Sequence, residues 1–156
     1  MQQDAEEANL LFVVRATNIV ETKMKSIIAN FARIPEEKRT FVDAFLLHNS
    51  IVSFAAKSKL ILAIAKELGV RMDKNAIHVL LSRRNAFAHQ DHLKAARVVT
   101  DQDGVPDVAF VVESIKGNGE LEVITQEQAF IEFVSAYETV ERDLDALAVA
   151  AAGSTP

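Results

Sequence analysis

The chain has 156 residues and a net charge of −5, with 49% hydrophobic and 25% charged residues, the usual balance of a globular protein with one core. It has no cysteine, which excludes a disulfide framework and a thiolate metal site. The acidic start MQQDAEEANL is unlike a secretory signal, and apolar runs such as LILAIA are too short to span a membrane. We therefore predict a soluble cytoplasmic protein, with one domain over residues 1–150 and a disordered tail over residues 151–156.

Apolar residues recur every three or four positions through the first half of the chain, which predicts four helices. The RIPEE stretch at 33–37 separates the first helix from the second, and HNS at 48–50 interrupts the helical pattern before the third helix. Residues that favour helix ends then give the boundaries. The expected caps are Asp4, Ser53 and Asp73, Pro35 is expected in the first turn of the second helix, and Gly69 is expected to end the third.

The pattern changes after residue 92. Three stretches rich in β-branched residues, ARVVT, DVAFVVESI and ELEVIT, are separated by the turn sequences DQDG and KGNG. Thr125 is then expected to cap a last helix with an apolar stripe. The predicted fold class is mainly α: an antiparallel bundle of four helices, a small three-stranded antiparallel β meander inserted at about 95–125, and a C-terminal helix.

Charge is distributed unevenly along the chain. Residues 1–56 carry a net charge of −1, residues 57–97 carry +6 and residues 98–156 carry −10. A ligand that bears phosphate groups would favour the basic block. The alternative interpretation is that these lysines and arginines only solvate helix faces.

The basic block contains LLSRRNAFAHQ at 80–90, in which polar residues interrupt an apolar helix. One side of this helix is expected to carry Ile77, Leu80, Leu81, Arg84 and Ala88. At about 100° per residue, Asn85 and His89 lie on nearly one face, and only a long arginine stem lets Arg84 reach the same cleft. Two structural interpretations stay open. In the first, Arg84 and His89 are surface cations near a helix end, where positive charge is favourable. In the second, Asn85 and His89 tie two helices together.

The RNAFAH motif, together with VSFAAKSKLILAIAKELG before it, resembles the HEPN superfamily (higher eukaryotes and prokaryotes nucleotide-binding domains), whose signature is Arg, often Asn, and a His after four to six residues. The resemblance implies a helical bundle that dimerises with its motif helices facing each other. It also implies a metal-independent endoribonuclease without a cofactor, as in toxin–antitoxin and phage-defence systems, with an antitoxin or regulatory protein as a further partner.

The resemblance assigns roles to three residues. His89 would be the acid or base for attack of a ribose 2′-hydroxyl on the adjacent phosphate, because histidine titrates near neutral pH. Arg84 would hold the phosphate with paired hydrogen bonds, and Asn85 would orient the scissile group or support the histidine. Some HEPN toxins are nucleotidylated on a tyrosine two positions after the histidine. Asp91 stands there in this chain, so that regulation is not expected.

Three further residues are candidate contacts to the RNA backbone. Arg83 points to a different side from Arg84, and its alternative role is to pair with an acidic neighbour. Lys57 matches the family-like helix, but the sequence slightly favours a solvated or structural lysine. His92 follows His89 by three positions and is either part of the site or a loop residue without a role.

A second function also stays open, since some HEPN domains are not nucleases. It is a non-catalytic HEPN-like binding or regulatory module, similar to mannitol operon repressor proteins.

Overall fold

The computed structural model describes residues 2–88, 96–100, 106–115 and 119–153, and it confirms the mainly helical class. The helices, with one π-helical turn labelled η1, are α1 (Gln2–Phe31), α2 (Glu36–Phe41), η1 (Val42–Leu46), α3 (Phe54–Glu67), α4 (Lys74–Ala88) and α5 (Gln126–Gly153). The strands are β1 (Ala96–Thr100), β2 (Pro106–Ile115) and β3 (Leu121–Thr125). None of the helices in this described part is long and apolar enough to cross a bilayer.

Most of the helix ends lie where the sequence predicts them. The Ser53 side chain accepts a hydrogen bond from the Ala56 amide at 3.2 Å, and Asp73 Oδ1 accepts from the amides at the start of α4. Thr125 caps α5 in the same way, through the Gln128 amide at 3.2 Å. The first helix differs from the prediction, since it begins at Gln2 and includes Asp4 in its first turn.

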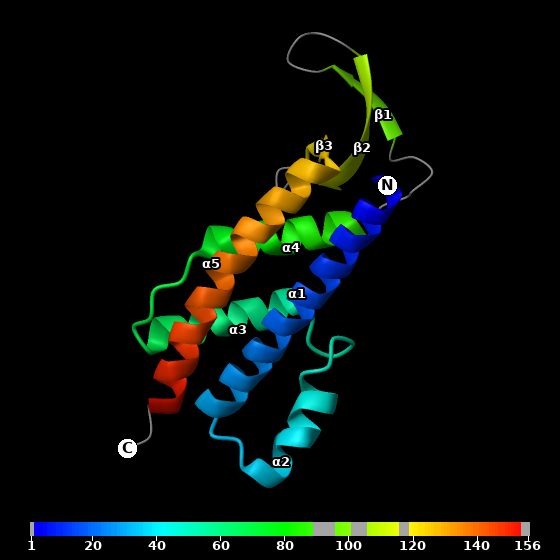
Figure 1. Cartoon of the computed structure of the whole chain (residues 1–156). Helices are drawn as coiled ribbons and strands as arrows, with labels where there is room; N and C mark the ends of the chain where they lie inside the picture. Colours follow the sequence, from blue (N-terminus) through cyan, green and yellow to red (C-terminus); the bar gives the residue numbers. More distant parts are fainter. Residues whose placement is uncertain (1, 89–95, 101–105, 116–118, 154–156) are drawn as a thin grey trace.

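The sequence predicts an antiparallel bundle, but two of the long helices run parallel to each other. Figure 1 shows α1 and α5 side by side, both running from the end that bears the strands toward the end that bears α2. The helices α3 and α4 are antiparallel to each other and cross that pair from behind. The reason is topological: α4 and the strands return the chain to its starting end, so α5 has to run in the direction of α1.

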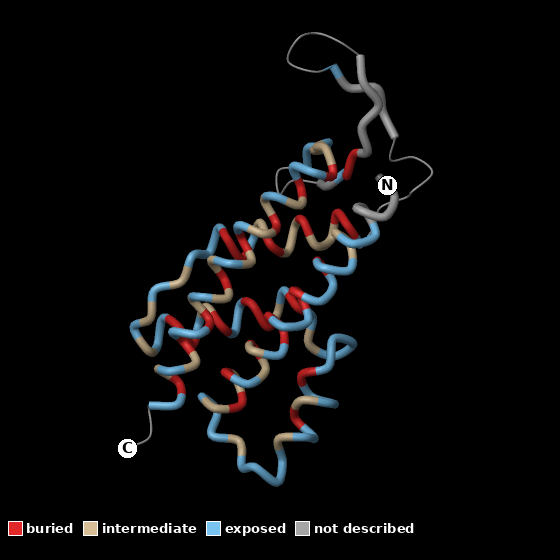
Figure 2. Tube along the Cα trace, in the orientation of Figure 1, coloured by how far each residue is buried: buried red, intermediate tan, exposed pale blue. Residues whose placement is uncertain are grey.

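The core lies between these two layers of helices (Figure 2). Phe12 of α1 makes edge-to-face contacts with aromatic rings of α5, at centroid distances of 5.6 Å to Phe130 and 6.0 Å to Tyr137. Lys23 adds a hydrogen-bonded ion pair at 2.6 Å to Asp145 across the same interface. The side chains that are almost completely buried include Val20, Met24, Ile27, Ile61, Leu80, Phe133, Val140, Leu144 and Leu147.

The strands form two antiparallel ladders that meet along β2. Residues 106–110 of β2 pair with β1, and residues 111–115 pair with β3, so no level of the sheet is three strands wide within the described residues. Val112 belongs to the helical core, whereas the β1 end extends beyond the helices in Figure 1. At the other end of the chain, α5 continues to Gly153 and buries Ala151, so the first residues of the expected tail are helical.

Candidate functional site

The arginine pair Arg83–Arg84 lies in the last turns of α4, and its two members face different surroundings. The buried side of α4 consists of Ala76, Ile77, Leu80, Arg83, Ala86 and Phe87. The predicted stripe was therefore wrong at its C-terminal end, because Arg83 is buried there while Arg84 is half-buried and Ala88 exposed. Residues 76, 80, 83 and 87 follow the three- to four-residue spacing of one helix face. An arginine is buried on such a face only when its charge is paired.

Arg83 is paired with two carboxylates. Its Nε donates to Glu132 Oε2 at 2.7 Å, and a terminal nitrogen donates to Glu122 Oε2 at 2.5 Å. Burial lowers the pKa of the guanidinium, but the hydrogen bonds and charges of both glutamates outweigh burial and raise that pKa. The acidic pairing that the sequence left open is thus present, and it ties α4 to β3 and α5. A role for Arg83 on the RNA backbone remains only a prediction.

Arg84 differs in its partner. A terminal nitrogen of its guanidinium donates to Asn85 Oδ1 at 3.0 Å, and no carboxylate among the described residues lies within ion-pair distance. A guanidinium carries five N–H donors, so most of them stay available. Asn85, itself half-buried, orients the group. The structure therefore brings Arg84 and Asn85 together, whereas His89 and His92 lie outside the described residues.

Arg84 lines a pocket of about 100 Å³ between α4 and α1. The walls that α1 contributes are Leu10, Val13, Val14, Thr17 and Asn18. The Thr17 hydroxyl is occupied, since it donates to the Val13 carbonyl at 2.7 Å. The exposed Asn18 amide makes no hydrogen bond to another described residue, so it can contact a ligand beside Arg84. Sequence reasoning missed Asn18, because only the fold brings this turn of α1 next to α4.

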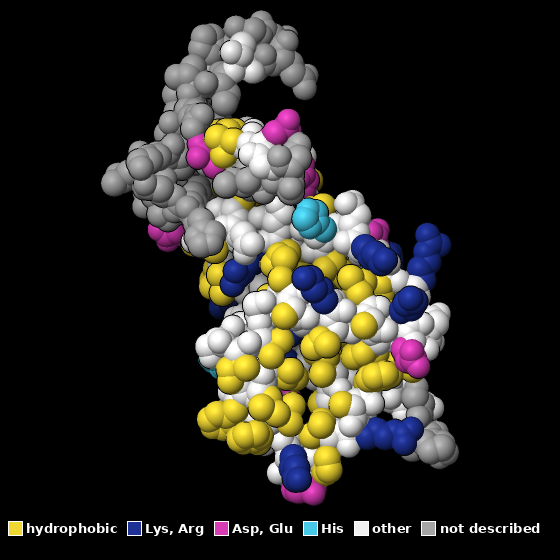
Figure 3. All heavy atoms as spheres, turned by 180° about the vertical axis from the view of Figure 1, so that it is seen from behind, with side chains coloured by type: hydrophobic (Ala, Val, Ile, Leu, Met, Phe, Trp, Pro, Cys, Tyr) yellow, Lys and Arg dark blue, Asp and Glu magenta, His cyan; other side chains and the backbone are white. Residues whose placement is uncertain are grey.

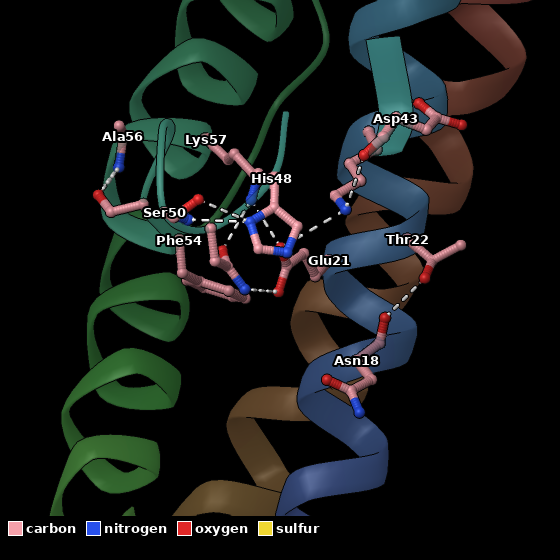
Figure 4. Close-up of polar contacts among 12 residues, drawn as sticks. Asn18, Glu21, Thr22, Asp43, His48, Ser50, Phe54, Ala56 and Lys57 are labelled. Atoms are coloured by element: carbon pink, nitrogen blue, oxygen red, sulfur yellow. Dashed lines mark hydrogen bonds and ion pairs between the residues drawn. The ribbon is translucent and has the colours of Figure 1, made fainter. Parts of the chain in front are cut away.

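Lys57 lies at the centre of a closed polar network and is fully buried. Its Nζ donates to Glu21 Oε1 at 2.6 Å and to Asn49 Oδ1 at 2.8 Å, and Asn49 Nδ2 donates to Glu21 Oε2 at 2.9 Å. Figure 4 shows Lys57 and Glu21 pointing toward each other between α3 and α1. This arrangement favours the structural role of Lys57 over a contact to RNA.

The same network holds Glu21 in its charged form. Burial raises the pKa of the Glu21 carboxyl, but the hydrogen bonds from Lys57 and Asn49 and the charges of Lys57 and Lys25 lower the pKa by more. The pKa consequently lies below its ordinary value. The network is therefore an ion pair with its hydrogen bonds satisfied, and it joins α1, the 47–53 turn and α3.

These three ion pairs change how the basic block at 57–97 is interpreted. Lys57 and Arg83 are neutralised by carboxylates from outside the block, so they add no net charge to the surface. The exposed cations that remain on α3, α4 and their connection are Lys59, Lys66, Arg71 and Lys74. Figure 3 shows Lys and Arg side chains spread over this face, with few Asp or Glu among them.

In comparisons with models of protein families, with curated proteins and with solved structures, no match to this chain was found.

Proposed function

We propose that the protein is a metal-independent endoribonuclease of HEPN type that acts in the cytoplasm as a homodimer. The observation that carries the proposal is the contrast within the arginine pair. Arg83 is held by Glu122 and Glu132, while Arg84 lines a pocket and is hydrogen-bonded only to Asn85 among the described residues. An arginine with available donors beside an oriented amide is suited to binding a phosphate through two parallel hydrogen bonds.

The proposed reaction is an internal transfer at one phosphodiester. His89 takes the proton of the ribose 2′-hydroxyl, the 2′-oxygen attacks the adjacent phosphorus, the P–O5′ bond breaks, and the 5′-oxygen takes a proton from water as it leaves. Arg84 holds the phosphate and stabilises the charge that develops on its oxygens, and Asn85 keeps the guanidinium in place. The products are a 2′,3′-cyclic phosphate, or the 3′-phosphate formed from it, and a 5′-hydroxyl. In a cell such an enzyme fits a toxin or a phage-defence effector, controlled by an antitoxin or regulatory protein.

The small volume and partly apolar lining of the pocket beside Arg84 favour a second function. At about 100 Å³, with Leu10, Val13 and Val14 among its walls, the pocket is nearer to the size of one side chain than of a nucleotide. A non-catalytic module of the same superfamily would insert a residue of a partner protein there. It would bind this partner through Arg84 and cleave no RNA.

Incubation of the pure protein with a mixed RNA pool in EDTA separates the two functions. The nuclease is expected to cut RNA in EDTA and to leave cyclic phosphate or 3′-phosphate ends, because histidine and arginine need no metal for this reaction. Ends that carry a 5′-phosphate, or no cleavage at any protein concentration, would contradict the proposed nuclease.

Binding of RNA is expected to depend steeply on salt. Several exposed cations lie on α3, α4 and their connection, and each contact to a phosphate of a single strand contributes a slope of about −0.7 in log affinity against log salt. Four such contacts predict a slope near −3, measured by fluorescence anisotropy with an uncleavable RNA. A slope near zero would remove the reason for assigning RNA as the ligand.

A further inference from the structure

A second, larger pocket lies at the opposite end of α4 from Arg84. It has a volume of about 660 Å³ and is formed where the α3–α4 connection meets α5. Three cations line it: Arg71 and Lys74 from the connection and the start of α4, and Arg142 from α5. All three are exposed, and Arg142 keeps 74% of its side-chain surface accessible. Arg142 is one of only two cations in the acidic segment 98–156.

The two acidic residues of this pocket are engaged by the backbone. Asp73 Oδ1 accepts hydrogen bonds from the amides of Asn75 and Ala76, at 2.9 and 3.0 Å. Asp143 Oδ2 accepts from the Asp73 amide at 2.8 Å. These carboxylates therefore fix the connection to α5 and occupy the first amides of α4, so the cations and not the helix end would bind a ligand.

The three cations of the pocket outnumber its two carboxylates. The exposed Arg142 guanidinium lies 3.6 Å from Oδ1 of the half-buried Asp143, a long ion pair that leaves most of the arginine accessible to a ligand. Arg71 and Lys74 form no ion pair with a carboxylate of the described residues, and both are exposed. Figure 3 shows Lys and Arg side chains gathered at the edge of the molecule where α4 begins. Three cations and two carboxylates line this hollow, so it keeps a net positive charge that favours an anionic ligand.

The lining also indicates which kind of polyanion fits. Besides the charged residues it contains Met72 and Asn75, and no aromatic ring on which a base could stack. Cations without a stacking platform contact the backbone of a nucleic acid and leave its bases unread. A rise of 1.5 Å per residue places Lys74 about 15 Å along α4 from Arg84, the length of a few nucleotides of single strand.

We propose that Arg71, Lys74 and Arg142 form a subsite for the phosphates of single-stranded RNA, separate from the phosphate that Arg84 holds. The subsite rests on the proposed function, because it assigns a second contact to the same substrate. The subsite gives a role to Arg142, which lies in an otherwise acidic segment. It also lets the enzyme bind phosphates of the strand other than the one that reacts.

The test measures binding of a labelled 2′-O-methyl oligoribonucleotide, which lacks the 2′-hydroxyl and cannot be cleaved. The triple variant Arg71→Ala/Lys74→Ala/Arg142→Ala is expected to bind at least tenfold more weakly at low salt, with a salt slope smaller by about 2. Arg142→Ala alone is expected to reduce the slope by about 0.7. Lys38→Ala is the matched control, because it removes one exposed cation from α2, away from the pocket.

The subsite is wrong if the triple variant binds like Lys38→Ala while circular dichroism shows both to be folded. It is also wrong as an RNA subsite if micromolar pyrophosphate binds the wild type but not the triple variant while both bind the oligonucleotide equally well, because the pocket then takes a small polyphosphate. Failure of the proposed function gives a different result. The wild type would then bind the uncleavable strand with the predicted slope and cut no RNA in EDTA.

Discussion

Replacement of His89 by alanine is expected to lower RNA cleavage by about 10²- to 10⁴-fold, the usual contribution of a general acid or base. Binding of RNA is expected to change little, because the proposed role of His89 is proton transfer and Arg84 holds the phosphate. The measurement compares single-turnover cleavage rates of the variant and the wild type in EDTA.

His78→Ala is the control for this substitution, since His78 is exposed on the same helix and has no proposed role. The stability cost of His89→Ala is expected to be about 1 kcal/mol. Full activity in a folded His89→Ala protein would contradict the role in catalysis. Loss of folding would instead support the interpretation in which Asn85 and His89 tie two helices together.

Replacement of Lys57 by methionine is expected to cost about 3–5 kcal/mol of unfolding free energy. The substitution leaves Glu21 charged and mostly buried, and it removes a donor from Asn49. Urea unfolding followed by circular dichroism measures the loss.

The double variant Glu21→Leu/Lys57→Met is the control for the ion pair. It removes both charges, so it is expected to recover a large part of the stability that Lys57→Met loses. If Lys57→Met costs less than 1 kcal/mol and instead weakens RNA binding, the structural role assigned to Lys57 is wrong.

The parts of the fold that the sequence predicts are those governed by neighbouring residues. Ser53, Asp73 and Thr125 cap the helices that follow them, because a short polar side chain satisfies amides two or three residues away. Gly69 ends α3 with a φ of 68°, a conformation that glycine adopts without strain. The strand at 96–100 likewise lies where its β-branched residues place it.

The parts that depend on distant partners could not be predicted. Periodicity gave no means to decide which arginine of the pair faces inward, because Glu122 and Glu132 are brought to Arg83 only by β3 and α5. The same is true of Glu21 and Lys57, which lie 36 positions apart. The direction of α5 relative to α1 depends on how α4 and the strands return the chain, and no local pattern records it.

The candidate site was predicted only in part. The side chains of Arg84 and Asn85 contact each other through a hydrogen bond within α4. Asn18 and Arg142 carried no local signal, since each becomes relevant only through a pocket formed with a helix distant in sequence. The expected contribution of His89 remains a prediction from the motif.

The most direct test of the proposed role of Arg84 is the rate of RNA cleavage in EDTA by Arg84→Ala, measured beside the wild type and Lys38→Ala. We expect a loss of about 10²- to 10³-fold for Arg84→Ala with weaker RNA binding, because the variant lacks both a phosphate contact and the charge that stabilises the transition state. Arg84→Lys is expected to recover little of the rate, since an ammonium lacks the planar pair of donors. Cleavage by folded Arg84→Ala at the rate of Lys38→Ala would contradict the claim that Arg84 holds the scissile phosphate.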